Sequence, residues 1–206
     1  MNLESVFRGL FVLSGVAMLC IRVYYQRRAR QASGQVTIRE KGWSLVAGSL
    51  AALITLVFGA EYIFFPGAFA WAYVQYPDSL RWLGALFLAI GITLLGVSHH
   101  HLGKSFHSFV VTKEGQTFVD SGPYRWIRHP IYTAFLINYV GGGLLAGNWV
   151  LTFTPGLLYG ILVALRVKNE EQAMLEQFGQ VYADYMRRTG RFLPVIRAKA
   201  PSGSVQ

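Results

Sequence analysis

The sequence is poor in charged residues and contains a single cysteine. Charged residues make up only 14% of the 206 residues and hydrophobic residues 53%, whereas a soluble domain usually carries about 25% charged residues. The one cysteine, Cys20, excludes an intrachain disulfide, and its apolar neighbours favour a small packed side chain within a helix. The composition therefore favours an integral membrane protein over a soluble domain.

Acidic residues are also scarce, because 10 aspartates and glutamates face 19 lysines and arginines and leave a net charge of +9. An excess of this size could indicate a nucleic-acid partner. However, long uncharged stretches separate the basic residues, so the sequence predicts no continuous basic surface. Nucleic acid is therefore not an expected partner.

Long apolar runs predict an all-α bundle with five membrane spans. A span needs about 20 apolar residues. The segment 130–165 contains thirty-six residues without a charge, too many for one span, and glycines at 141–143 and at 147 predict that it folds as a helical hairpin. Three further runs have spanning length: 6–25, 43–65 and 80–97.

The basic residues predict the orientation of these spans. Seventeen of the 19 lie either in the segments that follow the first, third and fifth runs or, in the case of Arg22, near the end of the first run. An odd number of spans places these three segments on one side of the membrane. Lysine and arginine collect on the cytoplasmic side. We therefore expect a multi-pass protein with its N-terminus outside and its C-terminus and functional site in the cytoplasm.

Two polar features stand out near the spans. Glu61 is an acid within the second span, where a carboxylate indicates function by default, but its place near the outer interface beside Tyr62 favours a structural role. The run His99–His101 opens a segment, 98–129, that we expect to be a polar loop. Three consecutive histidines on a helix point in three directions, so we favour an interfacial role for the run and predict no metal site.

A motif at 122–132 differs in kind, with the sequence Gly122-Pro-Tyr-Arg-Trp-Ile-Arg-His-Pro-Ile-Tyr132. Its Gly-Pro pair predicts a turn, and Pro130 suits the first turn of the fourth span. His129 and Tyr132 would then lie at a helix N-terminus, where free backbone N–H groups favour anionic ligands. A basic and aromatic membrane-interface anchor explains the same residues equally well.

A second group of candidate residues follows the fifth span. Arg166 and Glu170 are four residues apart on one helical face, and Glu171 is adjacent. An ordinary ion pair at a helix end, worth about 0.3–0.5 kcal/mol, is the alternative explanation. Apolar residues then recur at spacings of three and four and predict an amphipathic cytoplasmic helix: Met174, Phe178, Val181, Tyr182 and Tyr185.

Together these motifs resemble the isoprenylcysteine carboxyl methyltransferase and phospholipid methyltransferase superfamily. The motif at 122–132 is followed after about forty residues by Glu170 and Glu171, and then by Phe178-Gly179, Tyr182, Tyr185, Arg191 and Pro194. The resemblance covers roughly residues 85–195. It implies a membrane-embedded methyltransferase that uses S-adenosyl-L-methionine without a soluble Rossmann domain, and the sequence contains no strand–GxGxxG–helix unit.

The resemblance also implies a set of site residues. Arg166 would contact a substrate carboxylate, and Arg166 and Glu170 would be the catalytic pair. The implied division of the chain is three spans in 1–97, the cofactor loop, hairpin and catalytic helix in 98–197, and a disordered tail in 198–206. The cofactor contacts carried over by position are Thr112, Gln116, Thr117, Phe118, Val119, Tyr124, His129, Pro130, Ile131, Tyr132 and Glu170.

The chemistry of the acceptor favours a carboxylate. A carboxylate is ionised at neutral pH and needs no general base, whereas an ammonium acceptor must lose a proton and would be repelled by Arg166. We therefore expect carboxyl O-methylation of a lipophilic, isoprenylcysteine-like substrate. A phospholipid amine N-methyltransferase, a sterol-reductase-like NADPH enzyme and a non-enzymatic membrane protein remain as alternatives. The sequence indicates neither the physiological acceptor nor an oligomeric state.

Overall fold

The structure is a computed structural model that describes residues 2–31, 42–103 and 119–195. Within these ranges it is all-helical, as the sequence predicts, and it contains no β-strand beyond two isolated bridges. Two short 3-10 helices, η1 (Ala70–Ala72) and η3 (Gly122–Arg125), lie in connections. The α-helices are α1 (Leu3–Gln31), α2 (Gly42–Phe64), α3 (Asp78–Leu102), α4 (Pro130–Ala146), α5 (Trp149–Phe178) and α6 (Gln180–Arg188).

The first five α-helices occupy the positions of the five predicted spans. Four of them, α1, α2, α3 and α5, are long and apolar enough to cross a membrane. Helix α4 has 17 residues, or about 26 Å of helix, which is slightly shorter than a bilayer core of about 30 Å. Large apolar side chains such as Leu56 and Leu157 are more than 60% exposed on the helix surfaces. Such surfaces need lipid around them, so the protein is a multi-pass membrane protein.

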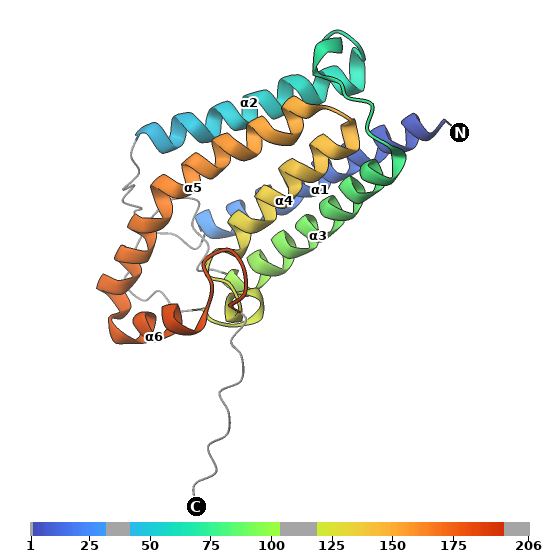
Figure 1. Ribbon diagram of the computed structural model, residues 1–206. Helices are drawn as coiled ribbons and strands as arrows, with labels where there is room; N and C mark the ends of the chain where they lie inside the picture. Colours follow the sequence, from blue (N-terminus) through green and yellow to red (C-terminus); the bar gives the residue numbers. More distant parts are fainter. Residues whose placement is uncertain (1, 32–41, 104–118, 196–206) are drawn as a thin grey trace, which may run out of the picture.

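The helices run back and forth, with α3 packed mainly against α4 and α2 against α5 (Figure 1). Figure 1 shows the C-terminal ends of α1, α3 and α5 at one end of the bundle, together with the first residues of α2 and α4, η3 and α6. We call this the basic end, because the predicted basic segments adjoin it. The arrangement agrees with basic segments on a single side of the membrane, while the orientation towards the cytoplasm stays a prediction.

The glycines at 141–143 do not interrupt the helix, contrary to the prediction that they would contribute to the turn of the hairpin. They lie within α4, where they allow neighbouring helices to approach closely. A Cβ on Gly143 would lie 2.1 Å from the backbone nitrogen of Thr152 in α5, and one on Gly141 would lie 2.9 Å from the carbonyl oxygen of Gly84 in α3. Side chains larger than hydrogen at these two positions would therefore separate the helices.

The turn between α4 and α5 is formed by Gly147 and Asn148, the second predicted break. Gly147 has a φ of +64°, which L side chains rarely adopt. The Asn148 side-chain oxygen accepts a hydrogen bond from the Leu151 N–H at 3.1 Å and so caps the first turn of α5. The hairpin prediction is correct at this position, since a glycine ends one helix and an asparagine begins the next.

Two helix boundaries differ from expectation. Helix α3 continues to Leu102, so it crosses the expected division at residue 97 and includes His99–His101. His99 is buried and its ring stacks on that of Tyr25 in α1, with centroids 5.1 Å apart. This first histidine of the run thus packs inside the bundle, whereas His101 is exposed.

Helix α5 continues well beyond the apolar run and ends at Phe178, where Gly179 takes a φ of +54°. Met174 and Phe178 therefore belong to α5. The short amphipathic helix α6 keeps Tyr182 and Tyr185, which are both buried, while Val181 is exposed. Its apolar face thus packs on the protein itself. The expected disordered tail lies outside the described residues.

Glu61 has the structural surroundings that its position near the outer interface suggested. Its side chain is buried and accepts hydrogen bonds from the N–H groups of Gly67 and Phe69 at 3.0 and 3.1 Å. The Tyr73 hydroxyl donates a third bond at 2.6 Å. The carboxylate therefore holds the connection between α2 and α3 at the end of the bundle opposite the basic end.

Candidate active site

The polar motifs meet at the basic end of the bundle, where the chain after α6 lies beside the motif that precedes α4. Ile127 and Gly190 form a parallel β-bridge. The Arg128 N–H donates to the Gly190 carbonyl at 2.8 Å, and the His129 N–H donates to the Arg191 carbonyl at 3.1 Å. The start of α4 is therefore joined to the C-terminal segment, and the His129 N–H is not free for an anion, contrary to the prediction.

Pro130 begins α4 as predicted, with His129 at the N-cap position. Proline suits this place because its fixed φ is compatible with the first turn and its missing N–H would have no helical partner. The helix then directs Tyr132 towards α5, where the Tyr132 hydroxyl donates a hydrogen bond to Glu170 Oε1 at 2.5 Å. Two predicted cofactor residues from different helices are thus in direct contact.

Arg166 joins the same group from one helical turn earlier in α5. Its Nη2 lies 3.4 Å from Glu170 Oε1, and its guanidinium lies 6.0 Å from the centre of the Tyr132 ring. The Arg166 side chain is 14% exposed and that of Glu170 is 20% exposed. The structure therefore brings together all three predicted residues, Arg166, Glu170 and Tyr132, in a partly covered polar group.

His129 lies between two carboxylates. Its Nδ1 is 3.6 Å from Glu170 Oε2, and its Nε2 is 3.4 Å from Glu171 Oε1. The imidazole also stacks on the Tyr132 ring, with centroids 5.6 Å apart and planes 18° apart. These contacts hold the imidazole ring in one orientation between the two carboxylates.

Glu171 is the residue that the sequence analysis left without a role. Its Oε1 accepts hydrogen bonds from Arg128 Nε at 2.9 Å and from Arg191 Nε at 3.2 Å. The hydrogen bond to Glu171 raises the pKa of Arg191 above its ordinary value, so this arginine stays charged. The Glu171 side chain is only 5% exposed. One carboxylate therefore ties α5 to the motif before α4 and to the segment after α6.

The sequence contains a signal for this role of Glu171. Arg128 in the 122–132 motif and Arg191 in the C-terminal segment have no acid within four residues in the sequence. Of the two adjacent acids at the end of the apolar span, one is enough to balance the charge of Arg166. The spare acid could therefore have been assigned to the distant arginines, but the sequence alone does not indicate which of the two faces them.

Tyr124 is buried in η3, beside α6. Its carbonyl oxygen accepts a hydrogen bond from the Tyr185 hydroxyl at 2.7 Å. Burial raises the pKa of the Tyr124 phenol, and to a smaller extent so do Tyr185 and Glu170. The phenol is therefore neutral at physiological pH and can act only as a hydrogen-bonding and packing group.

The remaining predicted cofactor residues have different surroundings. Val119 is half-buried just before η3, and Pro130 is fully buried. Ile131 packs against a core cluster of Leu95, Ala134 and Phe135, so it faces the bundle interior. The other four predicted residues lie outside the described part of the chain: Thr112, Gln116, Thr117 and Phe118.

Comparison with known proteins locates this arrangement in a family. Residues 82–176 match the model of the isoprenylcysteine carboxyl methyltransferase family. Over these residues the chain is similar to the isoprenylcysteine carboxyl methyltransferase family. The matched residues include the motif at 122–132 together with Glu170 and Glu171, so the family match and the polar group coincide.

Individual members of this superfamily are similar over part of their length. The chain is 30% identical over 112 residues to a protein-S-isoprenylcysteine O-methyltransferase of Schizosaccharomyces pombe, covering 53% of this chain and 48% of that one. It is 29% identical over 114 residues to the cobalt-zinc-cadmium resistance protein CzcN of Cupriavidus metallidurans, covering 55% and 51%. The alignments thus span about half the length of these two relatives.

A solved structure has a related fold. It is that of a eukaryotic intramembrane Ras methyltransferase of the isoprenylcysteine carboxyl methyltransferase type, with a TM-score of 0.54 and 24% sequence identity. The match covers 78% of this chain and 55% of the other. The superfamily's membrane fold therefore extends beyond the matched residues 82–176 of this chain.

Proposed function

We propose that this protein is a membrane methyltransferase that uses S-adenosyl-L-methionine to methylate the carboxylate of a lipophilic acceptor, with an S-isoprenylcysteine as the model substrate. The observation that carries the proposal is the group formed by Glu170, Tyr132, His129 and Arg166 at the basic end. Relatives named protein-S-isoprenylcysteine O-methyltransferases favour the same chemistry. The group combines a partly exposed carboxylate with an arginine. The carboxylate suits the positively charged ammonium of the cofactor, and the arginine suits the negatively charged carboxylate of the acceptor.

The residues fit the cofactor's amino-acid end, which carries an ammonium and a carboxylate. Glu170 would hold the ammonium. Its carboxylate offers about four lone-pair positions, accepts one hydrogen bond from Tyr132 and keeps 20% of its side chain exposed. His129 and Tyr132 would line the same side, since their stacked rings adjoin Glu170. When bound, the cofactor supplies an electrophilic methyl group on a sulfonium.

Arg166 would hold the acceptor. Its planar guanidinium can bind a carboxylate through two parallel hydrogen bonds, and it lies 6.0 Å from the centre of the Tyr132 ring. An ionised carboxylate needs no general base, so this chain has to supply alignment and exclusion of water. Alignment of the reacting atoms contributes much of the rate enhancement of an in-line displacement. Side chains held by contacts between two helices are suited to provide this alignment.

Binding measurements test the cofactor. Isothermal titration calorimetry on the protein in detergent should detect S-adenosylhomocysteine and not NADPH. Binding of NADPH without S-adenosylhomocysteine would overturn the proposal in favour of a reductase.

Product analysis tests the acceptor. With radiolabelled S-adenosylmethionine, N-acetyl-S-farnesylcysteine should yield a methyl ester that releases volatile label in base. Phosphatidylethanolamine should yield no base-stable methylated amine. The reverse pattern would support methylation of a phospholipid amine instead.

A further inference from the structure

Arg22 is an exposed charged residue on the side of α1 that lies beside α4. Its guanidinium lies 5.3 Å from the centre of the Phe135 ring in α4. Tyr25, three residues later on the same helical face, stacks on His99, and the adjacent Ile21 packs against the cluster around Leu95. Arg22 therefore belongs to the side of α1 that contacts α3 and α4.

A row of aromatic rings connects this position with the candidate active site. The Tyr159 ring lies 5.4 Å from Phe135, which Arg22 contacts, and 6.1 Å from Tyr132, which is bonded to Glu170. Tyr139 extends the row, with its ring 5.5 Å from Tyr159. The row of rings thus runs from Phe135, which lies beside Arg22, to Tyr132, which belongs to the polar group of the candidate active site.

The two arginines lie at a similar depth. Arg22 follows the first residue of α1 by 19 positions, or about 29 Å of helix, and Arg166 follows the first residue of α5 by 17 positions, or about 26 Å. Both helices begin at the end of the bundle opposite the basic end (Figure 1). Both arginines therefore lie in the half of their helix that is nearer the basic end.

The charges of the two arginines are balanced differently. Arg166 is 3.4 Å from Glu170. Within the part of the chain that the structure describes, Arg22 has no ion pair and no hydrogen bond to an acid, and its side chain is exposed. An unbalanced cation in a spanning helix is costly and by default indicates a function. An anionic ligand would provide the missing partner.

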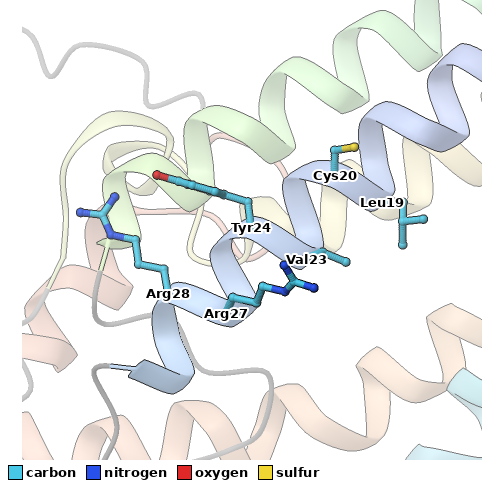
Figure 2. A pocket seen from close by; sticks show the side chains of 6 residues that line it. All are labelled: Leu19, Cys20, Val23, Tyr24, Arg27 and Arg28. Carbon is cyan, nitrogen blue, oxygen red and sulfur yellow. The ribbon is translucent and has the colours of Figure 1, made fainter.

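Ordinary snorkelling towards the membrane surface explains other arginines of α1 better than Arg22. Figure 2 shows Arg27 and Arg28 with Leu19, Cys20, Val23 and Tyr24 along a surface pocket of α1. By helical periodicity Arg27 and Arg28 occupy a different face from Arg22, because they follow it by five and six residues. Arg27 lies one to two turns nearer the helix end and is exposed, so it provides a matched control on the same helix.

We propose that Arg22 binds the anionic group of the lipophilic acceptor and acts with Arg166 as its second cationic contact. A guanidinium offers a carboxylate a planar fork, and the row Tyr132, Tyr159, Phe135 and Tyr139 offers an apolar surface to the acceptor's hydrocarbon tail. This inference rests on the proposed function. It adds a specificity residue from α1, which lies outside the matched residues 82–176.

The test uses the full-length protein in lipid nanodiscs and three variants: Arg22→Gln, Arg22→Lys and Arg27→Gln. For each we would measure kcat and KM with N-acetyl-S-farnesylcysteine, inhibition by its neutral carboxamide, and the affinity for S-adenosylhomocysteine. Arg22→Gln should raise the acceptor KM by about tenfold, the scale of one charge-assisted hydrogen bond. It should leave the affinity for S-adenosylhomocysteine and for the carboxamide within about twofold.

The control variants sharpen this result. Arg22→Lys keeps the charge without the fork and should raise KM by about threefold. Arg27→Gln should leave KM unchanged. An unchanged KM in Arg22→Gln would overturn the inference, and so would a parallel loss of S-adenosylhomocysteine affinity, because that loss would indicate a structural role. A wild-type protein that binds no S-adenosylhomocysteine would instead refute the proposed function itself.

Discussion

The two ends of the helical bundle are built from the same residue types and use them differently. At the end opposite the basic end, Glu4 forms ion pairs with Arg81 at 2.8 Å and Arg8 at 3.2 Å. Glu61 accepts three hydrogen bonds there from the α2–α3 connection. At the basic end, Glu171 is as enclosed as Glu61, but the neighbouring Glu170 keeps a fifth of its side chain exposed.

This difference separates a structural carboxylate from a candidate ligand-binding one. The partners of Glu61 are fixed groups of its own connection, and its side chain is buried. Glu170 faces Tyr132, His129 and Arg166 from two helices and retains an open side. A carboxylate in a membrane helix indicates function by default, but its hydrogen bonds and exposure decide whether another molecule has room to bind.

The largest expected effect tests whether the two ends lie on opposite sides of the membrane. In a Cys20→Ala background, single cysteines in place of Arg28 and Arg187 should react with an impermeant maleimide from the same side. A cysteine in place of Phe65 should react only from the other side, because it follows α2 at the opposite end. The result is all-or-none for each position. Labelling of Arg28→Cys and Arg187→Cys from different sides would refute the five-span arrangement.

The next largest effect concerns the enclosed carboxylate of the basic end. Glu171→Gln removes the charge that balances Arg128, whose side chain is only 9% exposed. An uncompensated buried charge should lower the free energy of unfolding by about 3–5 kcal/mol. Chemical denaturation in micelles would measure the change. Glu176→Gln is the matched control, since Glu176 is bonded only to an exposed glutamine on the same helix, and an equal loss in both variants would contradict the role of Glu171.

A smaller effect directly compares the open and the closed carboxylate. Glu170→Gln should weaken S-adenosylhomocysteine binding by about 1.5–3 kcal/mol, because a charged hydrogen bond to the ligand's ammonium is lost. Glu61→Gln should leave this affinity unchanged and reduce only thermal stability. Calorimetry and thermal melting of both variants provide the two measurements. Unchanged affinity in a folded Glu170→Gln protein would remove Glu170 from the cofactor site.

The smallest effect concerns the arginine beside Glu170. Arg166→Lys keeps the charge but loses the planar fork that would position the acceptor carboxylate. Turnover of N-acetyl-S-farnesylcysteine should fall about tenfold, equivalent to about 1.4 kcal/mol, with little change in S-adenosylhomocysteine affinity. A lysine variant with wild-type turnover would show that Arg166 does not grip a carboxylate, and methylation of a phospholipid amine would become the leading function.

The sequence by itself determined the features that depend on neighbouring residues. Bilayer thickness imposes the length of each apolar run, so the five helices were predictable. The contact of Arg166 with Glu170 follows from four-residue spacing on one helix. The start of α4 at Pro130 and the turn at Gly147 follow from backbone preferences of single residues.

Tertiary structure alone decided the features that join distant segments. Glu171 meets Arg128 from 43 residues away and Arg191 from 20. The glycines at 141–143 look like a helix break in the sequence, but they serve as contact points for α3 and α5. Arg22 reads as one more cytoplasmic charge until its contact with Phe135 is known. Helix packing sets which faces meet, and a periodic apolar sequence is compatible with several such packings.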